Sequence, residues 1–172
     1  IKKNLKIKKI GLKTNKTNFL PFNRLKVRLK KEIVSLGQGK INVNKFRGKI
    51  VSPKKWDKLI SKEATKVIDV RNIYEIEIGK FKKAINPNTE NFRQFPNAIK
   101  KLDINTEDNI AMYCTGGIRC DKASAFLKKK GFKNIFQLEG GIINYLSYAK
   151  DNKVKSNWAG ECFVFDERVT IN

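Results

Sequence analysis

The chain has 172 residues, of which 40% are hydrophobic and 10% aromatic, and this composition predicts one packed domain of ordinary size with a smaller appendage. Histidine is absent, which excludes Cys–His and Ser–His catalytic pairs and imidazole metal ligands, and no other metal site is evident. The net charge of +22, from 38 basic and 16 acidic residues, favours a polyanionic partner such as a nucleic acid.

The positive charge is concentrated at the front of the chain. Residues 1–50 contain 16 Lys or Arg and a single acid, Glu32, although an AT-rich gene would also enrich lysine without selection for binding. No stretch of about 18 apolar residues is present, so no membrane-spanning segment is expected. Three cysteines, an odd number, suit a reducing compartment, and we expect the protein in the cytoplasm. Because the chain starts at Ile1 without a methionine, we expect a fragment or an internally started chain.

The first segment, residues 1–39, is predicted to be the end of a small basic α+β domain whose beginning is missing. A short strand is expected over residues 6–11 and an irregular link over 18–22. Residues 24–34 alternate in the manner of a strand, with apolar residues on one face and basic residues on the other. That basic face is a candidate surface for RNA phosphates, with a solvated strand face as an equally weighted alternative. Its members are Arg24, Lys26, Arg28 and Lys30.

A polar linker over residues 37–48 leads into a second pattern, and a second domain is predicted over residues 40–150. A helix is expected to begin at Ser52 and Pro53, because the serine can accept N–H bonds as a cap and proline is preset for the first turn. Residues 65–71 then form a short apolar strand, typical of a parallel sheet that is buried on both faces. The buried stripe of the helix is predicted to consist of Trp56, Leu59 and Ile60.

Asp69 and Arg71 lie at the carboxyl end of this strand. Ligands of open α/β sheets collect at the carboxyl ends of strands, and this strand is expected to neighbour the one that ends at Cys114. Both residues are therefore supporting candidates for a site. The alternative is that they brace neighbouring loops through ion pairs, which is the favoured interpretation for Asp69 and an even one for Arg71.

The remaining elements alternate between strands and helices. They are predicted as a loop over residues 74–79, a short strand over 84–87, a helix interrupted at Pro96 over 91–102, strands over 109–113 and 134–138, and helices over 121–130 and 142–150. This alternation predicts an α/β fold with a parallel sheet of four or five strands covered by helices. Residues 151–172 are expected to form an aromatic extension that could pack beside the active face.

The seven residues 114–120, CTGGIRC, form the most informative stretch. They connect a predicted strand to a predicted helix, so the glycines can turn backbone N–H groups toward the Cys114 sulfur while the helix N-terminus adds partial positive charge. Both effects favour a thiolate, and we interpret Cys114 as a nucleophile rather than a buried core cysteine. The rest of the predicted cradle is Thr115, Gly116, Gly117, Ile118, Arg119 and Cys120.

The spacing within this loop argues against phosphate chemistry. Cysteine phosphatases hold phosphate with a Cys-x5-Arg loop, whereas here Cys120 stands at that position and Arg119 comes one residue earlier. Cys120 is expected to be a small residue in the first turn of the helix, with a resolving thiol for Cys114 as the alternative. Cys162 is interpreted as a core residue rather than a catalytic one.

An ordered set of motifs over about residues 48–150 resembles rhodanese domains. The set comprises VIDVR at 67–71, Glu75 with Gly79 and Asn86, the loop at 114–119, and LEGG at 138–141. Over nearly the whole chain, the stretches PFNRLKVR at 21–28, YCTGGIRC at 113–120 and GECFVFDERV at 160–169 resemble the rhodanese-type tRNA uridine hydroxylases.

This resemblance implies oxygen-dependent 5-hydroxylation of the wobble uridine, position 34, with Cys114 as the catalytic residue. The implied partner is tRNA, contacted in the anticodon region, and the implied co-substrates are molecular oxygen and an unidentified reductant. No cofactor is evident in the sequence. That family has a complete ferredoxin-like first domain and a cysteine-rich tail, so the first segment resembles the C-terminal remnant of such a domain.

Two alternatives remain open. A rhodanese-type sulfurtransferase would carry sulfane sulfur as a Cys114 persulfide held by the loop amides, although the basic front disfavours so small a substrate. A tRNA-binding module without enzymatic activity is the other alternative.

Overall fold

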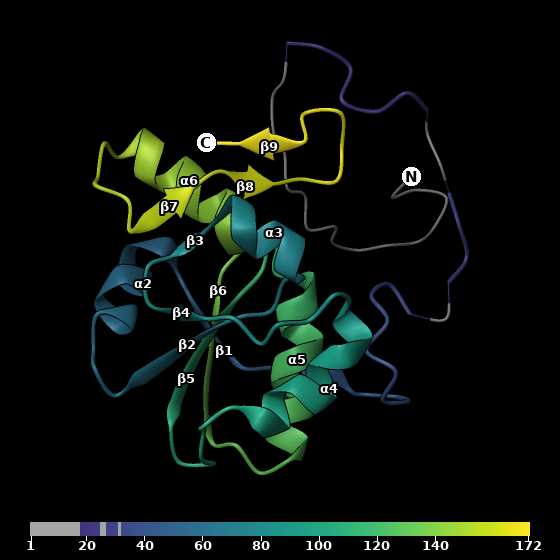
Figure 1. Ribbon diagram of the computed structural model, residues 1–172, viewed down its shortest axis with the longest axis vertical. Coiled ribbons are helices and arrows are strands. Elements are labelled where there is room, and N and C mark those ends of the chain that lie inside the picture. Colours follow the sequence, from purple (N-terminus) through teal and green to yellow (C-terminus); the bar gives the residue numbers. More distant parts are fainter. Residues whose placement is uncertain (1–17, 25–26, 31) are drawn as a thin grey trace.

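A five-stranded parallel sheet forms the centre of the molecule in the computed structural model, which describes residues 18–24, 27–30 and 32–172. The strands lie in the order β1-β6-β5-β2-β4 (Figure 1). Their bounds are Lys49–Val51, Asn134–Leu138, Asn109–Tyr113, Thr65–Asp69 and Ala84–Ile85, respectively. All four neighbouring pairs are parallel, and β2 lies beside β5, as the sequence predicted.

Helices cover both faces of the sheet because successive side chains of each buried strand point to opposite sides. In β5, Ile110 and Met112 belong to one core cluster, whereas Ala111 and Tyr113 belong to the other. The first cluster packs against α5 (Ile118–Lys129) and α4 (Phe95–Ala98), and α1 (Val43–Phe46) contacts α5. The second packs against α2 (Pro53–Ile60) and α6 (Gly141–Asp151), on the other side of the sheet in Figure 1. The predicted helix-covered parallel sheet is therefore confirmed.

A short helix, α3 (Ile73–Ile78), occupies the segment that the sequence predicted as a loop. The Glu75 carboxylate reaches back to the Asn72 N–H at 3.2 Å, and the Asn72 carbonyl accepts the N–H groups of Glu75 and Ile76. These bonds satisfy backbone groups that a helix start otherwise leaves unpaired. The loop prediction is wrong because these bonds cap and stabilise a short helix.

Two helix boundaries differ from prediction, whereas α2 begins at Pro53 as predicted. The Ser52 carbonyl starts α2 by accepting from Lys55 and Trp56, although the Ser52 side chain makes no capping bond. The segment after Asn91 is divided into the 3-10 helices η1 (Phe92–Gln94) and η2 (Ile99–Lys101) with α4 between them, because Pro96 fits the first turn of α4. Helix α5 begins at Ile118, so the last residues of the predicted loop form its first turn.

The predicted strand over residues 24–34 is wrong for the part of it that the structure describes. Arg24, residues 27–30 and residues 32–34 belong to no strand. Val27 is 85% exposed and Leu29 is fully exposed, so no sheet or core covers the apolar face on which the prediction relied. Lys26 and the predicted strand over residues 6–11 lie outside the described residues, and the ferredoxin-like remnant stays a prediction.

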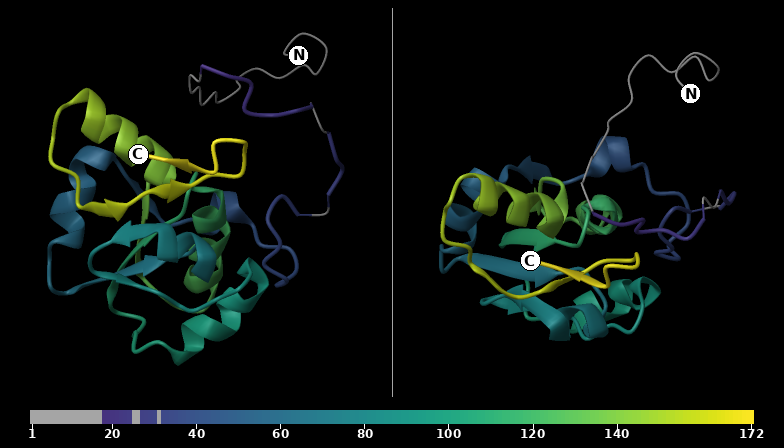
Figure 2. Two further views of the ribbon diagram at one scale, coloured as in Figure 1. Left: turned by 45° about the horizontal axis from the view of Figure 1, so that its top comes forward. Right: turned by 90° about the horizontal axis from the view of Figure 1, so that it is seen from above.

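The C-terminal segment runs back along the domain as short strands. β7 (Trp158–Gly160) pairs antiparallel with β3 (Gly79–Phe81), and β8 (Cys162–Phe163) pairs antiparallel with β9 (Thr170–Ile171). Figure 2 shows this segment, in yellow, beside α6. Within the described residues, no helix is long and apolar enough to cross a membrane.

Candidate functional site

The Cys114 thiol lies at the carboxyl end of β5, directly before the first turn of α5. Its side chain is 1% exposed, and the Gly117 N–H donates to the sulfur at 3.1 Å. Gly117 has φ +90°, a left-handed conformation that side chains disfavour, and this conformation turns the chain from the strand into the helix. The structure therefore brings the thiol, a glycine amide and a helix N-terminus together as predicted.

The electrostatic surroundings of this thiol favour its deprotonation. Burial is the largest single influence and raises the pKa of Cys114. Hydrogen bonds from the Cys120 side chain and from the backbone of Cys120 and Gly117, together with the charge of Arg119, outweigh burial and lower this pKa from 9.0 to about 6. A thiolate therefore predominates over the thiol by about tenfold at pH 7.

Cys120 complements Cys114 from the first turn of α5. It is fully buried, and burial together with its hydrogen bond to Cys114 and the charge of Cys114 raises the Cys120 pKa well above 9.0. It therefore remains a protonated donor to the neighbouring sulfur. Cys162 is also fully buried, and burial raises its pKa to about 12, which fits the predicted core role. None of the three cysteines forms a disulfide.

Arg119 holds a carboxylate rather than pointing freely into the cradle. Its guanidinium donates to both oxygens of Glu75 at 2.6 and 2.7 Å and to the Thr115 hydroxyl at 3.2 Å. Thr115 in turn donates to Glu75 at 3.1 Å. Burial lowers the pKa of Arg119, but the hydrogen bond to Glu75 and the negative charges of Cys114 and Glu75 raise it further above its usual value. The arginine thus acts on the thiol as a fixed positive charge.

Glu75 is the residue of this site that the reasoning from residue chemistry missed. It is fully buried, and it reaches the thiol loop across 44 positions of sequence through Arg119. Besides its place in the rhodanese-like motif set, Glu75 has one local signal in the sequence, because an acid three residues after Asn72 suits the start of a helix. That signal predicts a cap but not a buried ion pair.

Asp69 and Arg71 form a second buried ion pair, which braces the region behind the loop. Arg71 donates to Asp69 at 2.6 and 2.9 Å, and it also donates to the carbonyls of Glu75 at 3.0 Å and Gly79 at 2.6 Å. Both side chains are fully buried, and the Arg71 guanidinium stacks over Trp158 at 5.0 Å. These contacts fit the bracing interpretation for both residues. Through the carbonyls of Glu75 and Gly79, Arg71 holds the second half of α3 in place.

The thiol loop rests on the start of α6. Ile142 and Ile143 donate their N–H groups to the carbonyls of Cys114 and Thr115 at 3.0 and 3.2 Å. Gly141 has φ +70°, and a Cβ at this position would lie 2.4 Å from the Cys114 carbonyl oxygen and 2.8 Å from the Gly117 nitrogen. Only glycine lets the backbone of α6 come this close to the loop. The carbonyl groups of Cys114 and Thr115 are thereby bound by α6, and the Gly117 amide remains available to the sulfur.

An aromatic wall and a pocket lie beside this loop. The Phe165 ring, 63% exposed, sits 5.8 Å from the Arg119 guanidinium, which fits the predicted position of the C-terminal extension near the active face. A pocket of about 530 Å³ extends from both side chains toward Val34 and Arg93.

Of the four basic residues predicted to contact RNA, one lines a groove of the structure. Lys30 lines a larger groove of about 1440 Å³ that reaches Ile118 and Lys122 of α5. Arg24 and Arg28 are exposed but line none of the pockets described here, and Lys26 lies outside the described residues. Among the described residues, no group of three or more acidic or cysteine side chains is placed to hold a metal ion.

Comparison with known proteins gives a family and several relatives. The model of the rhodanese-like domain matches residues 52–147. The chain is 44% identical over its whole length to the tRNA uridine(34) hydroxylase of Neorickettsia sennetsu, of which it covers 63%. It is 51% identical over 89% of its length to the tRNA uridine(34) hydroxylase of Anaplasma phagocytophilum, of which it covers 55%. The chain thus spans less than two thirds of the length of these curated relatives.

Among solved structures, the chain is similar to the polysulfide-sulfur transferase homodimer from Wolinella succinogenes. The two share 26% identity with a TM-score of 0.50, over 59% of this chain and 75% of the other.

Proposed function

Because the chain belongs to the family of rhodanese-like domains, we propose that it uses the rhodanese loop thiol, Cys114, to hydroxylate C5 of uridine 34 in tRNA. The observation that carries this proposal is its 44–51% identity to proteins named tRNA uridine(34) hydroxylase. The site supports the proposal because it provides a thiolate at neutral pH without histidine.

The reaction must be balanced by an oxidant and a reductant. Uridine C5–H, molecular oxygen, two electrons and two protons give C5–OH and one water, and the electrons come from a reductant of unassigned class. The proposed role of Cys114 is addition of its thiolate to C6 of the uracil ring, which makes C5 electron-rich. One oxygen atom of O2 then forms the C5–O bond, the other leaves as water with the two electrons of the reductant, and loss of the C5 proton with cleavage of the C6–S bond restores the C5–C6 double bond and the thiolate.

The residues around Cys114 have distinct roles in this scheme. Gly117 and Cys120 donate hydrogen bonds that stabilise the thiolate before attack and again when it leaves. Arg119 stabilises the same negative charge, while Glu75 keeps its guanidinium in place. Because these donors are fixed by α5 and α6, they need no reorganisation during the reaction.

The covalent step can be tested with tRNA that contains 5-fluorouridine at position 34. Addition at C6 should trap an adduct between this tRNA and the wild-type chain, because fluorine at C5 obstructs the later steps. The adduct should be absent from Cys114→Ser. An active protein that forms no adduct would argue against covalent attack.

The proposed partner is the anticodon region of tRNA, and the proposed setting is the cytoplasm, where tRNA and reduced thiols occur together. The charge of +22 supports a polyanionic substrate. The function is tested by nucleoside analysis of tRNA from cells that lack the protein, complemented with wild type or Cys114→Ser. Nucleosides derived from 5-hydroxyuridine should return only with wild type, and unchanged nucleosides in the deletion strain would contradict the proposal.

Sulfur transfer is the second candidate, favoured by the likeness to the polysulfide-sulfur transferase. The Cys114 thiolate would attack thiosulfate to give a Cys114 persulfide and sulfite, and cyanide would then remove the sulfur as thiocyanate. The amides that stabilise the thiolate would equally stabilise a persulfide anion. Thiosulfate-dependent thiocyanate formation that is lost in Cys114→Ser would support this candidate.

A further inference from the structure

The pocket beside the thiol loop combines the groups that proteins use to hold a nucleobase. The residues that line it include the aromatic Phe165 and Phe92, the basic Arg93 and Arg119, and the polar Asn72 and Asn91, and of the two aromatic residues Phe165 is the exposed one. A volume of about 530 Å³ lies within the range of sites for small organic ligands. A thiosulfate or polysulfide donor would have no use for an exposed aromatic ring at this place.

Phe165 is held in place although it is exposed. Its ring meets Phe163 edge-on at 5.1 Å between centroids, and Phe163 meets Tyr74 edge-on at 5.4 Å. Arg119 lies at 5.8 Å from the Phe165 centroid while Glu75 occupies its in-plane donors. An exposed aromatic ring fixed beside a buried guanidinium is a suitable platform for stacking a base.

The pocket continues into a larger basic groove, since Val34, Ser35 and Arg93 line both. Lys30 and Lys40 also line the groove, and within residues 18–24, 27–30 and 32–172 no ion pair engages these two lysines or Arg93. Such cations are available to phosphates of a strand that leaves the pocket.

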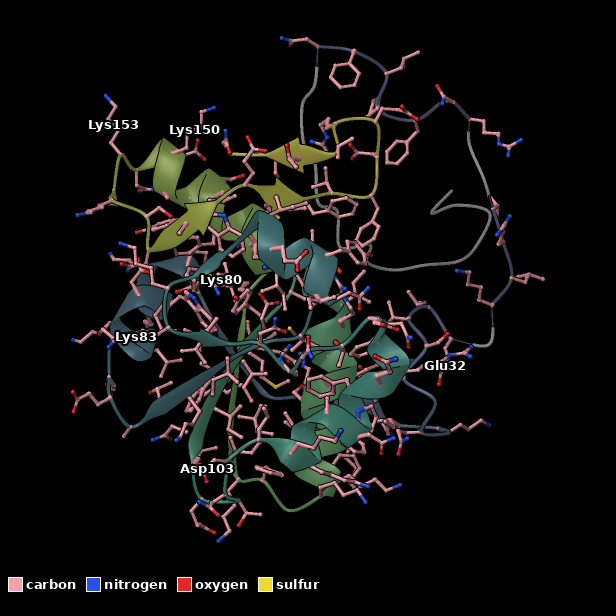
Figure 3. All side chains as sticks on the ribbon, in the orientation of Figure 1. Glu32, Lys80, Lys83, Asp103, Lys150 and Lys153 are labelled. Atoms are coloured by element: carbon pink, nitrogen blue, oxygen red, sulfur yellow. The ribbon has the colours of Figure 1, made fainter. Side chains whose placement is uncertain are left out.

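The outer wall of this groove is fastened to the domain by residues 32–36, here called the strap. Leu36 of the strap is 1% exposed, and Lys122 of α5 donates to the Val34 carbonyl at 2.8 Å and pairs with Glu32 at 3.4 Å. Figure 3 shows Glu32 on the side of the molecule away from Lys83 and Lys150. The groove thus has a fixed wall and lies on a different side of the molecule from Lys83 and Lys150.

We propose that this pocket is a subsite for the nucleotide adjacent to the reacting uridine, with its base stacked on Phe165 and its phosphate at Arg93. The adjacent nucleotide is assigned because the pocket is lined by Arg119 but not by Cys114. The strand then continues along the groove past Lys30 and Lys40. This subsite rests on the proposed function, since it takes single-stranded RNA as the substrate.

The subsite is tested with the 172-residue chain and an anticodon stem-loop RNA that carries 5-iodouridine on either side of position 34. Irradiation should cross-link one of these two probes to the peptide that contains Phe165. Phe165→Ala should weaken binding of the unlabelled stem-loop about tenfold, and Phe165→Trp should preserve it, because stacking tolerates any aromatic ring.

Removal of one positive charge inside the groove can be compared with removal of one positive charge outside it. Arg93→Gln should weaken binding and reduce the slope of log affinity against log salt by about 0.7, as expected for one phosphate contact to a single strand. Lys150→Gln removes the same charge from an exposed position on α6 and should leave both the cross-link and the stacking effect of Phe165 unchanged.

The outcomes separate the subsite from the hydroxylase activity. Cross-linking and Phe165-dependent binding without any hydroxylated product would support the subsite and contradict the proposed function. Hydroxylation with no cross-link near Phe165, and with equal affinity of Phe165→Ala and wild type, would overturn the subsite while the proposed function stands.

Discussion

At the scale of single residues, the thiol pKa is the property from which reactivity follows. Cys114 should show thiolate absorbance near 240 nm that rises with a midpoint at about pH 6, because its pKa is lowered from 9.0 to about 6. Cys120 and Cys162 should stay protonated over this range, since their pKa values are raised. The titration should disappear in Cys114→Ser, and Cys120→Ala should move the midpoint upward by removing a donor. A midpoint of the wild type near 9 would contradict this assignment.

The same pKa shift links stability to pH. The folded pKa of Cys114 lies below that of the unfolded chain, so the unfolded chain binds more protons between about pH 6 and 9 and the free energy of unfolding should rise with pH there. The contribution is complete above the unfolded pKa and is lost as the pH falls through about 6. Urea unfolding at several pH values should show a steeper rise for wild type than for Cys114→Ser.

Glu75 is the second residue whose role can be isolated. Glu75→Gln should lower the free energy of unfolding by about 3 kcal/mol, because it leaves the buried Arg119 without a charged partner. Glu77→Gln, an exposed change on the same helix, should alter it by less than about 0.5 kcal/mol. Urea denaturation compares the two variants, and equal stability would show that the ion pair does not hold the loop.

At the scale of elements, the contact between α6 and the thiol loop depends on one glycine. Gly141→Ala should destabilise the chain and raise the Cys114 pKa, because the new methyl would meet loop backbone at 2.4–2.8 Å. Gly131→Ala is the matched control, since φ is also positive but the nearest atom would lie at 3.8 Å. It should cost only the roughly 1–2 kcal/mol of left-handed strain. An unchanged thiolate titration in Gly141→Ala would contradict the role given to this contact.

The strap is a second element with a separable role. Leu36→Ala should speed hydrogen exchange of the Leu36 amide, which donates to Glu32 at 2.9 Å, because it removes the side chain that anchors the strap in the core. Leu29→Ala changes a fully exposed side chain and should leave this exchange unaltered. If both variants exchange at the wild-type rate, the groove wall does not depend on Leu36.

At the scale of the whole molecule, the sequence predicts the parallel sheet, whereas the strand predicted over residues 24–34 is absent from the part of it that the structure describes. The strands containing Val67 and Ile110 are short apolar runs that a parallel sheet buries on both faces, so their pattern identifies them. Apolar and basic residues alternate regularly around Leu29, yet the Leu29 side chain is fully exposed. Such alternation forms a strand only where a partner strand or a core covers its apolar face. Whether a partner exists is a tertiary property.

The site likewise has one part that could be predicted from the sequence and one part that could not. The Cys114 loop could be predicted because its glycines, thiol and helix start are adjacent in sequence, and local geometry brings them together. The pairing of Arg119 with Glu75 could not, because it depends on where the fold places α3 relative to α5. The sequence therefore predicts the reactive atom, whereas the groups that hold its surroundings become visible only in the folded chain.

We propose that the Cys114 thiolate serves oxidation of uridine 34 rather than sulfur transfer. The most direct test grows cells that lack the protein, complemented with wild type or Cys114→Ser, under heavy-isotope oxygen gas, followed by mass spectrometry of the nucleoside at position 34. We predict that the heavy oxygen atom appears on C5 of this nucleoside with wild type and not with Cys114→Ser. A nucleoside that gains sulfur, or an oxygen atom without the heavy label, would contradict the account.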